Sequence, residues 1–96
     1  MKAEREKIGH FLRGRREQMG LTEIQLAKML EKKEETVKAW EKGEKMPERG
    51  ILESLARCLQ VEMADIIMGE KVIIPEGGLP VEEMDEIIKK LIRWFL

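Results

Sequence analysis

The sequence has almost none of the residues on which enzyme chemistry and metal binding usually depend. Its 96 residues include one histidine (His10), one cysteine (Cys58) and one serine (Ser54). His10 has no nearby cysteine or second histidine with which to bind a metal, and neither Ser54 nor Cys58 has a recognisable base beside it. The eight glycines are scattered and form no glycine-rich phosphate loop. We therefore predict a protein that is not an enzyme and that uses no metal and no other cofactor.

Disulfide frameworks and membrane spans are also excluded. A single cysteine cannot form an internal disulfide, and it suits a reducing compartment. The first residues are charged throughout and lack the apolar core of a signal peptide, and no apolar run approaches the roughly 18 residues of a membrane span. We expect a cytoplasmic protein. With 18 basic and 19 acidic side chains the net charge is -1, so any surface that attracts nucleic acid must be local.

What the sequence does contain is helical periodicity, and it centres on residues 22–43. Thr22 and Gln25 have the spacing of a capping box, which predicts that a helix begins there. Apolar residues follow at helical spacing, the polar run 31–35 interrupts them, and Val37 and Trp40 resume the pattern before Gly43 ends it. The stretch predicts two short helices joined by a turn. Because isolated helices this short are marginal in water, they must share a core with their flanks.

The flanking segments predict three more helices. They cover residues 4–19, residues 51 to about 60, and residues 62–68, and glycines end the first and the last of them. Gly14 lies inside the first of these helices at a cost of about 0.5–1 kcal/mol relative to alanine, which a close helix contact would explain. We predict an all-α fold in which residues 1–68 form one five-helix bundle.

The remaining residues predict a linker and a sixth, amphipathic helix. Residues 69–80 contain an extended segment, 71–75, that is able to pair as a short strand, followed by a flexible Gly77-Gly78 joint. In the helix predicted over 81–96, the residues expected to mediate dimerisation are Val81, Met84, Ile88, Leu91, Trp94 and Phe95. Ile87 and Ile92 widen this stripe.

This apolar face can pack against three kinds of surface: the protein's own bundle, the same helix of a second chain, or a membrane surface. Six acidic residues against four basic ones after residue 68 argue against an anionic membrane. We expect no membrane binding, and we expect a homodimer held by residues 70–96.

Between Ile8 and Ile67 the combined spacing of several short motifs is typical of one family. The matching residues are Ile8-Gly9, Gly20-Leu21-Thr22, Leu26-Ala27, Leu30, Thr36-Val37, Trp40-Glu41-Lys42-Gly43, Pro47, Leu55-Ala56, Leu59 and Val61. In these residues the chain resembles the phage-repressor-like helix-turn-helix family, also called the XRE family. The resemblance implies a five-helix lambda-repressor-like domain that binds double-stranded DNA, often as a dimer, with the helix at about 34–42 in the major groove.

The resemblance also implies roles for individual residues. The positions that face base edges are Lys33, Glu34, Glu35, Thr36 and Ala39. The positions near phosphates are Thr22, Glu23, Lys32, Lys38, Lys42 and Lys45. Arg16 and Glu41 resemble a structural ion pair that joins the first helix to the third.

Acidic residues depart from what DNA binding favours. Carboxylates stand where DNA phosphates would lie, at Glu23, Glu34 and Glu35. No arginine occurs between residues 17 and 48 to donate two parallel hydrogen bonds to guanine. Glu34 and Glu35 have three interpretations: a solvated helix start that favours negative charge, readers of the cytosine amino group, or contacts to a basic protein partner. The leading hypothesis is a homodimeric, sequence-specific DNA-binding transcription regulator. The alternative is a protein-interaction module that uses this acidic helix or the C-terminal helix to bind another regulator.

Overall fold

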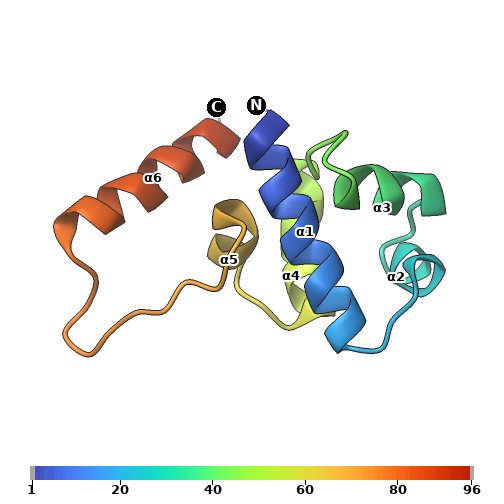
Figure 1. The fold of residues 1–96 in the computed structure, drawn as a ribbon, viewed down its shortest axis with the longest axis horizontal. Helices are drawn as coiled ribbons and strands as arrows, with labels where there is room; N and C mark the ends of the chain where they lie inside the picture. Colours follow the sequence, from blue (N-terminus) through green and yellow to red (C-terminus); the bar gives the residue numbers. More distant parts are fainter. Residues whose placement is uncertain (1, 96) are drawn as a thin grey trace.

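A computed structural model describes the backbone of residues 2–95 and the side chains of residues 2–93. The described chain contains six helices and no strand: α1 (Lys2–Gln18), α2 (Glu23–Met29), α3 (Glu34–Glu41), α4 (Arg49–Leu59), α5 (Met63–Met68) and α6 (Val81–Phe95). In Figure 1, α1 crosses the middle of the molecule, α2 and α3 lie on one side of it, and α6 stands at the opposite end. The predicted all-α fold, a five-helix bundle followed by a C-terminal helix, is confirmed.

Local capping explains where the central helices begin and end. The Thr22 hydroxyl accepts from the backbone N–H of Gln25 at 3.1 Å, and the Gln25 side chain accepts from the N–H of Thr22 at 2.8 Å. This is the predicted capping box, and it satisfies donors that a helix start otherwise leaves free. At the other end Gly43 has a φ of 75°, and its N–H donates to the carbonyl of Trp40 at 3.1 Å. The left-handed glycine therefore ends α3 where the sequence predicts.

The core draws on all five helices of the bundle. Its buried members are Ile8, Leu12, Leu26, Ala27, Leu30, Val37, Trp40, Leu52, Leu55, Ala56, Leu59, Ile66 and Ile67. Trp40, at a helical apolar position, is buried as predicted. Because α1 packs against α3, α4 and α5, while α2 packs against α3, the two short central helices obtain the shared core that they need.

The two glycines inside α1 have opposite surroundings. A Cβ built on Gly14 would meet nothing within 4 Å, so a close helix contact is the wrong explanation for this glycine. The close approach occurs at Gly9, where a Cβ would lie 2.5 Å from the carbonyl oxygen of Trp40 and 2.6 Å from that of Glu41. Gly9 is thus the position that lets α1 and the end of α3 touch.

The tail contacts the bundle at its far end. Residues 71–75 have neither helix nor strand, and Gly77 and Gly78 have φ values of 95° and 96°. α6 packs on α5, Leu91 packs against the core, and Arg93 Nη1 donates to Glu4 Oε1 at 2.8 Å. The ends of α6 and α1 therefore lie near each other (Figure 1). None of the described helices is long and apolar enough to cross a membrane.

Candidate nucleic-acid interface

The turn between α2 and α3 sets the angle of the second helix. Leu30 caps α2, Glu31 adopts a left-handed conformation with φ 56°, and the N–H of Lys32 donates to the carbonyl of Ala27 at 2.8 Å. The chain thus passes from α2 to α3 within four residues, 30–33. The result is two helices joined by a tight turn, with the outer side of α3 turned away from the core (Figure 1).

A buried ion pair holds this unit against α1. Arg16 donates from Nε to Glu41 Oε2 at 2.6 Å and from Nη2 to Glu41 Oε1 at 3.0 Å, while its Nη1 donates to the carbonyl of Leu21 at 2.8 Å. The hydrogen bond with Glu41 raises the pKa of Arg16, against the opposing effect of burial. Arg16 therefore stays charged at every working pH and joins α1, the loop before α2 and the end of α3.

The five lysines around α3 differ in what they contact. Lys38 lies 3.4 Å from Glu34, and Lys32 lies 3.8 Å from Glu48. Lys33, Lys42 and Lys45 are exposed, and in the described part of the chain none of them forms an ion pair. Three ammonium groups at the two ends of α3 are thus free for an external anion, while two are partly neutralised by the protein itself.

The acidic residues at the start of α3 also differ. Glu34 and Glu35 both lie in the first helical turn, where the helix dipole favours negative charge. Glu34 is half-buried and paired with Lys38, whereas Glu35 is exposed. The contacts of Glu34 support its interpretation as a structural helix start.

The other positions implied by the resemblance lie on or near this side. Thr36 and Ala39 are half-exposed on α3, and Glu23 is half-exposed at the start of α2. The exposed Thr22 hydroxyl accepts the capping bond from Gln25 and keeps its own proton for a second partner.

A hollow of about 250 Å³ lies between α1, α2 and α3. It is lined by Arg13, Arg16, Glu23, Lys38, Glu41 and Lys42. The lining holds four cations and two carboxylates, but Arg16 pairs with Glu41, Lys38 with Glu34 and Arg13 with Glu17. Among the described residues, Lys42 is the one cation of the hollow without an ion pair. Arg13 is exposed, and its only described ion pair is a long one, 3.5 Å from Glu17.

Sequence reasoning missed Arg13. Arg13 lies on α1, whereas the positions that the resemblance assigns to DNA contacts all lie between residues 22 and 45. Its position three residues before Arg16 was a usable signal, because residues three apart share a helix face.

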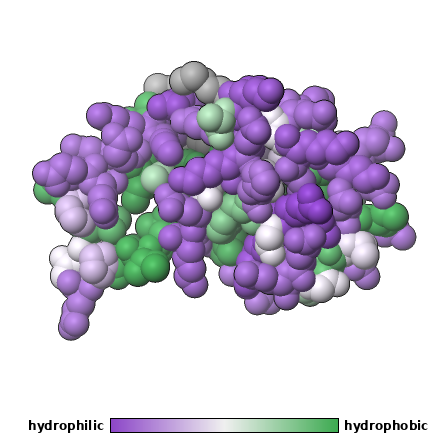
Figure 2. Space-filling view, in the orientation of Figure 1, coloured by the Kyte–Doolittle hydropathy of each residue, from purple (hydrophilic) through white to green (hydrophobic). Residues whose placement is uncertain are grey.

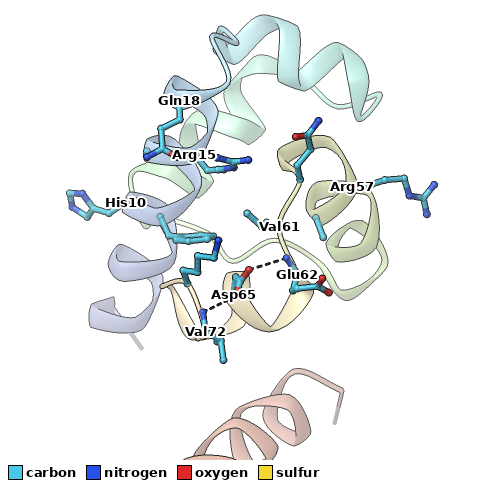
Figure 3. Close-up of a pocket in the computed structure, with 13 residues that line it drawn as sticks. His10, Arg15, Gln18, Arg57, Val61, Glu62, Asp65 and Val72 are labelled. Atoms are coloured by element: carbon cyan, nitrogen blue, oxygen red, sulfur yellow. Dashed lines mark hydrogen bonds between the residues drawn. The ribbon is translucent and has the colours of Figure 1, made fainter. Parts of the chain in front are cut away.

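A larger cavity, about 850 Å³, lies elsewhere, between α1, the α4–α5 junction and the start of the linker (Figure 3). Two of its polar side chains, those of Asp65 and Arg15, bond to the protein's own backbone. Asp65 accepts from the backbone N–H of Glu62 at 3.0 Å and of Val72 at 2.8 Å, and Arg15 donates to the carbonyl of Leu59 at 2.7 Å. His10 points away from the cavity (Figure 3). These bonds hold the start of the linker and the end of α4 in place.

Two short helices joined by a tight turn, packed against each other and held against α1, define a helix-turn-helix protein. The helix-turn-helix family model matches residues 12–66, more than half of the chain. The chain therefore belongs to the phage-repressor-like helix-turn-helix family and is a DNA-binding regulator in the general sense of that family. No curated protein and no solved structure matches the sequence. The matched region includes Arg16 and Glu41 and stops before α6.

Proposed function

We propose that the protein is a sequence-specific transcription regulator that binds double-stranded DNA as a homodimer, with α3 in the major groove. The observation that carries the proposal is the free lysines at the ends of α3: Lys33 at its start, and Lys42 and Lys45 beyond its end. Lys42 and Lys45, just beyond a groove-binding helix, can contact the phosphates at the edge of the groove, and Lys33 at its start can reach a base edge.

The residues divide into two roles under this proposal. Lys33, Glu34, Glu35, Thr36 and Ala39 face base edges, and of these Lys33 and Glu35 are the exposed, charged readers. Thr22, Glu23, Lys32, Lys38, Lys42 and Lys45 lie along the phosphates.

Arg13 joins the phosphate contacts. Its guanidinium supplies the forked donor geometry that suits phosphate oxygens and that the lysines lack. Glu23, across the same hollow, opposes part of this attraction and leaves the nonspecific affinity modest.

Selection of duplexes from a random library by the purified protein tests the proposal. We expect enrichment of a site with two inverted half-sites, because a two-fold symmetric dimer reads the same sequence on both strands. A variant carrying Lys33→Ala and Lys42→Ala serves as the control and should enrich the site poorly. Failure of the unmodified protein to enrich any duplex at low salt would overturn the proposal.

A second candidate function is a protein-interaction module on the same scaffold. The exposed Glu35 carboxylate favours it, because an unpaired acid suits a basic protein surface better than a phosphate. Neutralising the acids of α3 separates the two functions, as described in the Discussion.

A further inference from the structure

The apolar stripe of α6 is only partly covered by the protein's own bundle. Ile87 and Leu91 are half-buried, and Leu91 packs against the core. The other members remain open to solvent: Val81 is 69% exposed, Met84 46%, Ile88 47% and Ile92 49%. The side chains of Trp94 and Phe95, also predicted to mediate dimerisation, lie outside the described residues.

The four exposed residues form a continuous strip. Steps of three, four and four residues place them on one face of a helix. Packing onto the bundle therefore satisfies one edge of the amphipathic face and leaves the other edge without a cover.

The charges of α6 are separated along its length. Glu82, Glu83, Asp85 and Glu86 occupy the first half, and Lys89, Lys90 and Arg93 occupy the second half. Within the described residues Arg93 is the one charged residue of α6 that forms an ion pair, with Glu4 of α1. Asp85 and Lys89 follow Met84 and Ile88 directly, so they border the open strip with no partner of their own.

This separation decides which way round a second α6 can lie. A parallel copy would place the acidic half against the acidic half and the basic half against the basic half. An antiparallel copy places acid against base at both ends, which is the complementary arrangement. The apolar residues of the strip also pair well in the antiparallel orientation. A two-fold axis near residue 86 brings Val81 opposite Ile92 of the partner subunit and Met84 opposite Ile88 of the partner subunit.

We infer that the occupant of the strip is the α6 of a second copy of this chain, lying antiparallel to the first. The inference rests on the proposed homodimer and specifies its interface. Asp85 of each subunit approaches Lys89 of the partner subunit, and the exposed apolar residues meet at the centre.

Neighbouring apolar surface extends the interface. One pair of 15-residue helices buries less than the roughly 1,200 Å² of a stable complex. Beside α6 lies a hollow of about 430 Å³, lined by Val72, Ile73 and Leu79 and, from the side of α6 that faces away from the strip, by Glu82, Glu83, Glu86 and Ile87, so the occupant of the strip does not fill it. Figure 2 shows hydrophobic surface in the gap between α6 and the bundle. The further apolar area that a stable pair needs is supplied by the exposed linker residues Ile73 and Ile74.

Cysteine cross-linking distinguishes the two orientations. In a full-length chain carrying Cys58→Ala, single Val81→Cys and Ile92→Cys variants are oxidised separately and as an equimolar mixture. The antiparallel pair predicts a disulfide-linked dimer in the mixture and none from either variant alone. Cross-linking of either variant alone, or no cross-linking in any sample, would overturn the inference. Circular dichroism of each variant verifies that the helical fold is retained.

A mass measurement in the absence of DNA provides an independent test. We expect a dimer for the unmodified chain and a monomer for Ile88→Glu, which places a charge at the centre of the strip. Ile24→Glu is the matched control, since Ile24 is 50% exposed on α2, and it should remain dimeric. A monomeric unmodified chain at micromolar concentration would contradict the inference. Neither experiment contains DNA. A dimer that selects no duplex would therefore refute DNA binding and leave this interface standing, whereas a monomer that selects one would refute the interface and the homodimer and leave DNA binding standing.

Discussion

Arg16 and Glu41 face each other through two parallel hydrogen bonds, at 2.6 and 3.0 Å, with both side chains buried. Glu41→Ala would leave the guanidinium buried without its counter-charge. We expect a loss of about 3–5 kcal/mol in the free energy of unfolding, because an uncompensated buried charge is costly. Urea unfolding followed by circular dichroism measures it.

The matched control for this variant is Glu53→Ala. Glu53 contacts Arg57 at the same 2.6 Å, but on the exposed surface of α4. Its removal should cost about 0.5 kcal/mol or less, since exposed pairs contribute little. Equal losses in the two variants would contradict the structural role of the Arg16–Glu41 pair.

Replacing Gly9 or Gly14 by alanine should change the free energy of unfolding in opposite directions. Gly9→Ala would push a methyl group into the carbonyls of Trp40 and Glu41, and we expect it to destabilise the fold by about 1–3 kcal/mol. Gly14→Ala meets open space and should stabilise α1 by about 0.5–1 kcal/mol. Thermal and urea unfolding of both variants test the pair, and a stabilising Gly9→Ala would disprove the close approach of α1 and α3.

Neutralising Glu34 and Glu35 to glutamine separates DNA binding from protein binding. If the acids only begin the helix, the double variant should bind duplexes more tightly, because two negative charges near the phosphates are removed. If they read cytosine, the variant should lose its preference among sites while keeping nonspecific affinity. Duplex binding measured by fluorescence anisotropy decides. If the double variant loses binding to a basic protein partner while its duplex binding stays the same, the interaction module is favoured.

The Cys58 thiol makes the free energy of unfolding depend on pH. Burial raises the pKa of its thiol, with Arg57 opposing. Above about pH 8.5 the unfolded chain then loses this proton before the folded chain does. The contribution of Cys58 to stability is therefore present at neutral pH and is lost as the pH rises.

Urea midpoints at pH 7.5 and 9.5 measure this contribution. The unmodified chain should lose more stability between the two values than Cys58→Ala does. Equal losses would show that the thiol titrates alike in both states.

The sequence predicts the helices of the bundle well because their signals are local. The capping box of Thr22 and Gln25, the helix end at Gly43 and the apolar spacing around Trp40 each depend on neighbours within one or two turns. These features need no knowledge of the tertiary fold.

Most contacts between distant segments were missed by sequence reasoning, and the Arg16–Glu41 pair was expected only because the family resemblance implied it. Helical periodicity singled out Gly14, and Gly9 was noted only as part of the family pattern, because only the packing of α1 on α3 shows which glycine lies at a close contact. The nearness of Arg13 to the helix-turn-helix, and of Lys32 to Glu48, likewise depends on how the helices are arranged. The open strip of α6 was predicted only as part of a wider stripe, since the edge that the bundle covers cannot be read from periodicity.

The most direct test of the central claim, that the outer side of α3 binds duplex DNA, is the salt dependence of binding. We expect affinity to fall steeply between about 50 and 200 mM salt, with a slope of about 0.9 for each phosphate contacted. The double variant Lys42→Ala, Lys45→Ala, which removes two phosphate contacts, should lower that slope by about two. The control Arg57→Ala, on the exposed surface of α4, should leave it unchanged. A slope that stays the same in the double variant, or no duplex binding at low salt, would contradict the claim.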